Sequence, residues 1–106
     1  MKPKSRRFEV LLPVRFNDGR EVPDSMLAEA ANEIVEEFGA VSFRRDAVEG
    51  QWSYEGILYR DELVCLIVDV ADTMKSRKWM GAFKARWKRR LDQLEIWMVS
   101  YRIELE

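Results

Sequence analysis

Two helical stretches of opposite charge, set in a chain that otherwise favours strands, limit the folds this sequence can adopt. Residues 24–38 carry five acids and no base, whereas residues 73–91 carry eight bases and no acid. Apolar residues recur at helical spacing in both stretches, so each predicts a helix with one buried side. The residues expected on the buried sides are Leu27, Ala31, Ile34, Val35 and Phe38 in the first, and Trp79, Met80, Phe83, Trp87, Leu91 and Leu94 in the second.

The remaining segments have the pattern of strands. Residues 8–16 place apolar side chains at every second position, and residues 96–105 alternate in the same way. Between the two helices, residues 41–54 and 57–70 predict two long strands joined by a tight turn at Glu55-Gly56. The chain therefore reads strand, helix, strand, strand, helix, strand.

Turn and capping residues indicate where several of these elements begin or end. Pro13 cannot donate a backbone hydrogen bond, so it predicts a bulge or the end of the first strand. Pro23 suits the first turn of the first helix, and Gly39 suits the left-handed residue that ends it. Asp72 or Thr73 can cap the second helix.

This order of elements predicts an α+β protein with the ferredoxin-like βαββαβ fold. The fold is a four-stranded antiparallel sheet with the first and third strands in the centre and both helices on one face. A chain of 106 residues has room for one such domain, so we assign residues 1–106 to it and residues 1–7 to a basic N-terminal arm.

Composition excludes several classes of function. The chain has no histidine, which removes Ser-His-Asp and Cys-His catalysis and every zinc site that needs imidazole. Its single cysteine, Cys65, lies in an apolar run and is expected to be buried rather than nucleophilic. With no cysteine pair and no phosphate-binding glycine motif either, we expect no metal and no cofactor, and we lean against an enzyme.

The same sequence predicts a cytoplasmic protein without membrane contact. The basic start is followed by an apolar stretch that Glu9, Pro13 and Arg15 interrupt, so it lacks the pattern of a signal peptide. No run of about 18 apolar residues is present to cross a bilayer. A lone cysteine, which cannot form an intramolecular disulfide, fits a reducing compartment.

The charged helices have two interpretations. In the expected fold they lie side by side, so acids of residues 24–38 and bases of residues 73–91 can form ion pairs that set the register of the helices. Alternatively, the basic helix binds nucleic acid or phosphate through Lys84, Arg86, Lys88 and Arg89. We favour the first, because the net charge is −1 and the acidic helix would cancel much of the field.

The sheet predicts self-association. The two helices can cover one face only, yet residues 63–68 are apolar on both faces of their strand. The last strand presents apolar residues on both sides as well. An exposed apolar face of this size favours a partner, and a second copy related by two-fold symmetry is the simplest one. Two such sheets packed face to face would form a dimeric α+β barrel.

Functional residue types gather along the long hairpin. Trp52, Tyr59 and Arg60 could bind an aromatic or anionic ligand by stacking and a bidentate contact, and Asp61 or Glu62 could act as a base. The alternative, which we favour, is that the aromatic residues pack across the strands and the charges are solvated. Adjacent strand residues also point to opposite faces, so Asp61 and Glu62 do not readily converge on one substrate.

These hairpin residues also carry a resemblance. The run Gly50-Gln51-Trp52, the turn glycine Gly56 and the step Arg60-Asp61-Glu62 into an apolar strand, followed by a basic helix, resemble an uncharacterised bacterial family of small ferredoxin-like proteins. The resemblance covers residues 8–105 and implies the fold. It implies no activity, because none is assigned to the family. Members are often secreted, and this chain departs from them in lacking a signal segment.

Three functional hypotheses follow. The leading one is a cytoplasmic, homo-oligomeric domain that is non-catalytic or binds a ligand weakly. The alternative is a small dimeric α+β barrel enzyme acting on a small organic acid or aromatic compound, with Trp52, Tyr59, Arg60 and Asp61 lining its cleft. The third is a nucleic-acid or phosphate-binding module that uses the basic helix.

Overall fold

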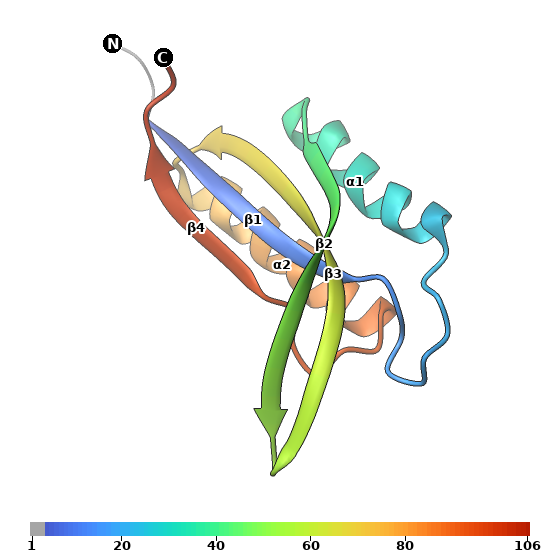
Figure 1. The fold of residues 1–106 in the computed structure, drawn as a ribbon. Coiled ribbons are helices and arrows are strands. Elements are labelled where there is room, and N and C mark those ends of the chain that lie inside the picture. The colour runs from blue at the N-terminus through green and yellow to red at the C-terminus, as the bar shows by residue number, and fades with distance from the viewer. Residues whose placement is uncertain (1–3) are drawn as a thin grey trace.

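The computed structural model describes residues 4–106, apart from the side chains of residues 46–52, 54 and 58–61. It contains the six elements in the predicted order (Figure 1). Their bounds are β1 Ser5–Pro13, α1 Asp24–Phe38, β2 Ser42–Tyr54, β3 Ile57–Ala71, α2 Met74–Arg90 and β4 Met98–Ile103.

The four strands form one antiparallel sheet in the order β2-β3-β1-β4. The first and third strands are therefore central, and both helices lie on the same side of the sheet (Figure 1). This confirms the predicted ferredoxin-like fold. The other side of the sheet has no helix over it, and we call it the uncovered face.

The strand ends differ from the prediction at both termini of the chain. Strand β1 already begins at Ser5, so Arg6 and Arg7 belong to the sheet and not to a separate arm. Their side chains find acidic partners on neighbouring elements, Asp72 for Arg6 and Asp69 for Arg7, which explains why a basic segment is strand. Pro13 ends β1, as its missing donor predicts. At the other terminus, β4 runs only from Met98 to Ile103.

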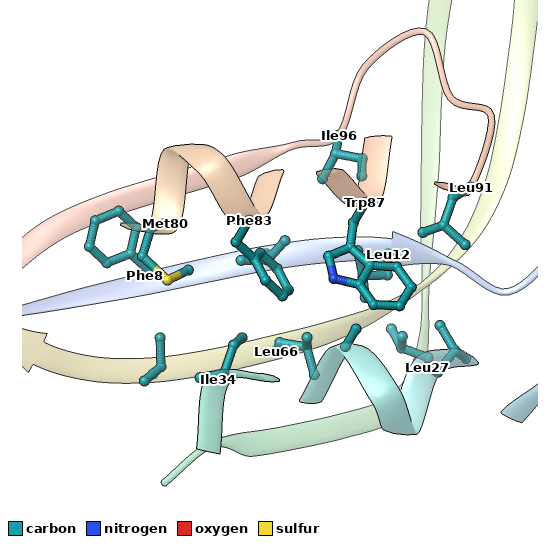
Figure 2. Close-up of a cluster of buried hydrophobic side chains, with 14 of the residues drawn as sticks. Phe8, Leu12, Leu27, Ile34, Leu66, Met80, Phe83, Trp87, Leu91 and Ile96 are labelled. Carbon is teal, nitrogen blue, oxygen red and sulfur yellow. The ribbon is translucent and has the colours of Figure 1, made fainter. Parts of the chain in front are cut away.

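The hydrophobic core lies between the helices and the sheet, and Figure 2 shows its largest side chains. Strand alternation places Phe8, Val10 and Leu12 of β1 opposite Val68, Leu66 and Val64 of β3 on the side that faces the helices. The helices add Leu27, Ala30, Ile34, Met80, Phe83, Trp87 and Leu91, and Ile96 closes one end. The predicted buried sides of the helices are thus largely confirmed.

Two residues expected in the core are exposed. Val35 is 39% exposed, because it follows Ile34 and so lies about 100° further around the helix, while Ala30 takes the inward position. Leu94 is 49% exposed, because α2 ends at Arg90 and the helical period no longer applies beyond it. Ile96, two residues further on, is buried instead.

Predicted turn residues have the conformations that their positions require. Gly39 is left-handed (φ 89°), and its N–H donates to the Val35 carbonyl at 2.7 Å. Thr73 caps α2, since its hydroxyl accepts a hydrogen bond from the Ser76 N–H at 3.1 Å. Both central residues of the hairpin turn, Glu55 and Gly56, have positive φ, as a type I′ turn demands.

The β2–β3 hairpin extends past the rest of the sheet (Figure 1). Strand β1 pairs with β3 only as far as Leu63, and β3 residues 57–61 pair with β2 alone. The register between β2 and β3 shifts between Arg44 and Val48, where the paired ladder is interrupted. The projecting hairpin gives the molecule a longest axis of 49 Å against 29 and 24 Å for the other two.

Candidate functional site

A cavity of about 270 Å³ lies where the hairpin meets the start of α1. Its apolar wall comes from the core side of the sheet and from α1, and its rim carries charges of both signs. The lining residues are Val14, Arg15, Glu21, Val22, Asp24, Leu27, Phe43, Arg45, Glu62 and Val64. A cavity between hairpin and helices is what the enzyme hypothesis requires, so that hypothesis stays open.

Backbone pairing fixes the rim of this cavity. The Val14 N–H donates to the Glu62 carbonyl at 3.0 Å, and the Val22 N–H donates to the Val14 carbonyl at 2.8 Å. These bonds hold the loop after β1 beside β3 and α1, although Val14 lies beyond the end of the strand. We predicted that β1 continues to Phe16, but residues 14–16 belong to a loop that is closed by a single β-bridge between Arg15 and Glu21. Residues of this loop form one wall of the cavity.

The arginines of the rim are loosely held. Arg45 lies 3.7 Å from Asp24 and over the ring of Phe43, 5.1 Å from its centroid, and Arg15 lies 3.9 Å from Glu21. All four charged side chains are at least half exposed. Long contacts between exposed charges are weak, so these groups can turn to a ligand at little cost. The arrangement suits a small organic molecule with a charged group and an apolar body.

Glu62 is the one member of the predicted hairpin cluster whose side chain the structure describes, and it is exposed at this cavity. The backbone of β2 and β3 pairs Trp52 with Tyr59 and Gln51 with Arg60. The side chains of Trp52, Tyr59, Arg60 and Asp61 lie outside the described residues. Their proposed roles in binding or catalysis therefore remain predictions.

The charged helices pair with each other within one chain. The Nε and one Nη of Arg86 both donate to Glu33 Oε1, at 2.9 and 2.6 Å, while the Trp87 indole donates to Glu33 Oε2 at 2.8 Å. Arg90 makes two parallel bonds of 2.9 Å to Glu29 and lies 4.3 Å from the centroid of the Trp87 ring. Arg90 also holds the pKa of Glu29 below its usual range. This confirms the first interpretation of the two helices.

The phosphate-binding residues predicted on α2 are largely engaged by acids. Arg86 is bonded to Glu33, and Lys84 and Lys88 lie 3.1 and 3.9 Å from Glu95. Arg89 is exposed. A phosphate at this end of the helix would have to compete with carboxylates already in place, and the case for binding there weakens accordingly.

The uncovered face of the sheet has a polar and an apolar part. Across its middle, Arg7 makes a bidentate pair with Asp69 (2.8 and 3.0 Å), and the Tyr101 hydroxyl donates to Glu9 at 2.8 Å. Toward the hairpin the face is apolar, and we call this part the apolar zone. By strand alternation and register it contains Leu11, Leu63, Cys65, Ile67, Trp97 and Val99.

Cys65 is buried, as its position in an apolar run predicted. Burial raises the pKa of its thiol, and the nearby Glu9 carboxylate acts in the same direction. A protonated thiol 2% exposed to solvent is a poor nucleophile. The residue therefore serves packing at the edge of the apolar zone.

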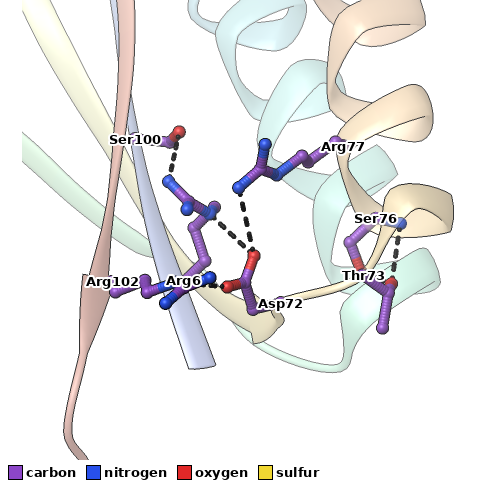
Figure 3. Close-up of polar contacts among 7 residues, drawn as sticks. All are labelled: Arg6, Asp72, Thr73, Ser76, Arg77, Ser100 and Arg102. Atoms are coloured by element: carbon purple, nitrogen blue, oxygen red, sulfur yellow. Dashed lines mark hydrogen bonds and ion pairs between the residues drawn. The ribbon is translucent and has the colours of Figure 1, made fainter. Parts of the chain in front are cut away.

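The sequence reading missed a cluster around Asp72, just after β3 (Figure 3). Three arginines from three elements contact this one carboxylate, which is 6% exposed. They are Arg6 of β1, Arg77 of α2 and Arg102 of β4. The strand register would have pointed to this cluster, because Arg6 and Arg102 lie directly opposite each other on paired strands. Like charges in that position repel unless an acid lies between them.

Among the residues that the structure describes there is no group of three or more histidine, cysteine, aspartate or glutamate side chains placed to hold a metal ion. No helix of the described chain is long and apolar enough to cross a membrane.

Solved structures share this fold across the whole chain. CutA1 from Oryza sativa is 15% identical with a TM-score of 0.67, covering 98% of this chain and 84% of its own. The divalent cation tolerance protein (Cut A1) from Thermus thermophilus is 15% identical with a TM-score of 0.65, covering 96% and 86%. A phage SAM lyase in complex with S-methyl-5'-thioadenosine is 13% identical with a TM-score of 0.68, covering 100% and 94%. No protein-family model and no curated protein matches the chain.

Proposed function

We propose that this chain is a homo-oligomeric ferredoxin-like domain, non-catalytic or weakly ligand-binding, in which a second copy covers the uncovered face. The observation that carries the proposal is the apolar zone with Trp97 at its edge. The Trp97 side chain is 64% exposed, although tryptophan is among the side chains that gain most from burial. Half-buried Leu11, Ile67 and Val99 extend the same surface.

The ion pair in the polar part of this face is compatible with burial. Arg7 and Asp69 already satisfy each other with two short hydrogen bonds, and Glu9 already accepts the hydroxyl of Tyr101. A partner can therefore cover Arg7 and Asp69 without leaving a lone charge, which is the costly case. The Glu9 carboxylate is bonded to a neutral hydroxyl and keeps its charge, so it must stay near solvent or meet a positive group of the second copy. Tryptophan, tyrosine and arginine are also the residues most enriched at the energetic centre of protein interfaces.

The test is the solution mass by light scattering at low and high salt. We expect a dimer or larger species at micromolar concentration that survives high salt, since apolar burial is not screened. Trp97→Asp should shift the mass to a monomer. Leu94→Asp is the matched control, because Leu94 is also exposed (49%) but lies on the loop after α2, and it should leave the mass unchanged. A monomeric wild-type chain would contradict the proposal.

A second candidate function is binding or conversion of a small organic acid or aromatic compound in the cavity beside the hairpin. The cavity itself favours it, with loosely held Arg15 and Arg45 for an anionic group, Phe43 for an apolar body and Glu62 as the described acid–base candidate. The same fold carries a ligand in the phage SAM lyase with S-methyl-5'-thioadenosine.

That comparison and the divalent cation tolerance proteins give the first compounds to test: S-methyl-5'-thioadenosine, S-adenosylmethionine and a divalent cation. Binding is measured by calorimetry, and turnover of S-adenosylmethionine by chromatography. A ligand of the cavity should lose affinity in Arg45→Gln and keep it in Arg89→Gln, which removes the same charge on the exposed surface of α2. If no compound binds, or if both variants behave alike, the cavity loses its support as a ligand site.

A further inference from the structure

The cluster around Asp72 holds more positive than negative charge. Arg6 Nε donates to Asp72 Oδ1 at 2.8 Å, Arg102 Nε donates to Oδ2 at 3.0 Å, and an Arg77 Nη lies 3.4 Å from Oδ1 (Figure 3). Three guanidinium groups thus share one carboxylate. Two positive charges remain within the cluster after Asp72 has neutralised one.

The three arginines are not equivalent. Arg6 is 12% exposed, and its second bond goes to the Ser100 hydroxyl at 3.1 Å, so this side chain is a fixed part of the structure. Arg77 and Arg102 are 48% and 66% exposed. Each guanidinium has five N–H donors, and Arg77 and Arg102 each donate one hydrogen bond to Asp72. Within the described part of the chain neither makes another side-chain hydrogen bond, so donors of both are left for a ligand.

Arg102 can also be reached from a neighbouring cavity. It lines an open cavity at the C-terminal end of β4, whose wall includes Lys4, Glu104 and Glu106. Lys4 lies next to the cluster, because its carbonyl accepts the Asp72 N–H at 2.9 Å. The Arg102 guanidinium can thus be approached by a ligand from this side, past a wall that carries one base and two acids. Arg77 does not line the cavity and is reached from its own exposed side.

We infer that Arg77 and Arg102, held on either side of Asp72, form a binding site for a phosphate dianion such as a phosphomonoester. Planar guanidinium groups offer paired donors that match phosphate oxygens. A phosphomonoester carries a charge of about −1.5 to −2 at pH 7, which matches the two uncompensated charges. A carboxylate or a phosphodiester carries only one charge.

This site lies away from the residues that the sequence suggested for phosphate. Lys84, Arg86, Lys88 and Arg89 lie in the second half of α2, whereas Arg77 lies in its first turns. Thr73 already caps the N-terminus of α2 by accepting the Ser76 N–H, so the proposed site consists of the arginine side chains alone. The proposal is also independent of self-association, since Arg6, Arg102 and Val10 alternate onto the side of the sheet that faces the helices.

The experiment is calorimetric titration of the full chain with inorganic phosphate, against chloride at matched ionic strength. We expect saturable phosphate binding in the wild type. The double variant R77Q/R102Q should lose at least about tenfold in affinity, because hydrogen bonds to charged groups are the strong ones. The matched control K75Q/K78Q removes two exposed charges of α2 that belong neither to the cluster nor to the residues that the sequence suggested for phosphate, and it should bind as the wild type does.

A third variant separates a binding site from a purely structural cluster. Asp72→Asn leaves three guanidinium groups without their carboxylate, so it should lower the melting temperature. If the cluster binds phosphate, phosphate should raise the melting temperature of this variant more than that of the wild type, because the anion takes the place of the lost charge. Equal shifts in the two proteins would mean that the cluster only ties the elements together.

Two further outcomes would overturn the inference. Absence of phosphate binding at low ionic strength is one, and equal loss of affinity in the two double variants is the other.

A short single-stranded oligonucleotide is the third ligand in the series. If it bound more tightly than phosphate, with an affinity that fell steeply with salt, the surface would be a nucleic-acid site and the assignment to a dianion would be wrong.

Discussion

Asp72 determines the local geometry of three elements at once. Its carboxylate joins β1 through Arg6, α2 through Arg77 and β4 through Arg102, and its own N–H donates to Lys4. The hydrogen bond from Arg6 is the main reason why the pKa of Asp72 lies below its usual range. A carboxyl group that prefers to stay charged in the folded state links stability to pH.

The direction of this linkage gives a prediction. Because folding lowers the pKa of Asp72, its contribution to stability is complete above the ordinary aspartate pKa of about 3.9 and is lost as the pH falls through the lowered value. Asp72→Asn should therefore be less stable than the wild type at neutral pH, and the difference should shrink in acid. Thermal unfolding in phosphate-free buffer from neutral to strongly acidic pH measures it.

Glu37→Gln is the control for this series, because Glu37 is an exposed acid of α1 outside the cluster. It removes the same charge and so separates net charge from the specific contacts of Asp72. A difference between Asp72→Asn and the wild type that did not change with pH would contradict the proposed linkage.

At the scale of elements, Glu33 is the residue that fixes α1 against α2. One of its oxygens accepts two bonds from Arg86, and the other accepts the Trp87 indole N–H. Trp87 is fully buried, so its indole N–H cannot donate to solvent water. The ion pair therefore matters less than the indole donor that the same carboxylate satisfies.

This contact predicts an order of stabilities. Glu33→Ala leaves the buried indole N–H unsatisfied and should lower the free energy of unfolding by about 1–3 kcal/mol. Glu33→Gln keeps an acceptor for Trp87 and should cost less. Glu36→Ala, at an exposed position of the same helix, should change stability by less than about 0.5 kcal/mol. Urea unfolding measures all three, and equal losses in the two Glu33 variants would show that charge dominates.

Elements of this chain were predictable because their signals are local. Alternation and helical spacing depend on neighbours a few residues apart, so the six elements, the capping Thr73 and the left-handed Gly39 were all visible in the sequence. Val35 was wrongly placed in the core because the predicted buried side of the first helix was too wide, and Leu94 because the second helix was predicted to be too long. These errors concern positions at the edge of a pattern and leave the pattern itself intact.

The candidate sites were less predictable, because they join residues far apart in the chain. Arg6 and Asp72 are 66 positions apart, and Arg102 lies 30 positions beyond Asp72. No local pattern marks such a contact, since it depends on the sheet order and on the register. Of the residues singled out on the hairpin, Glu62 lines the described cavity, whereas Arg15 and Arg45 enter it from loop and strand positions with no distinguishing motif.

At the scale of the whole molecule, the hairpin and the uncovered face are separable parts. The outer pairs of the hairpin, from Gly50 with Asp61 to Ser53 with Leu58, link β2 and β3 only to each other. Strand β1 reaches no further than Leu63. The core and the apolar zone therefore have no backbone pairing with the outer hairpin.

This separation leads to a test of which part makes the oligomer. Deleting residues 50–53 together with their partners 58–61 removes four pairs and keeps the alternation of both strands. It brings the pair of Tyr54 with Ile57, which closes the turn, next to the pair of Glu49 with Glu62. The shortened chain should fold, because every strand pairing within the sheet proper remains. Circular dichroism and cooperative thermal unfolding check this. Deleting residues 58–61 alone, which leaves four residues of β2 without partners, should disturb folding and serves as the control.

The mass of the shortened chain then identifies the contact. If the apolar zone makes the interface, the oligomer should persist, because Leu11, Ile67, Trp97 and Val99 are all retained, and Trp97→Asp should still dissociate it. If the shortened chain is monomeric while the full-length chain is not, the outer hairpin makes the contact and the role proposed for the uncovered face is wrong. Because apolar burial resists salt, the comparison is made by light scattering at high salt, where contacts between exposed charges contribute least.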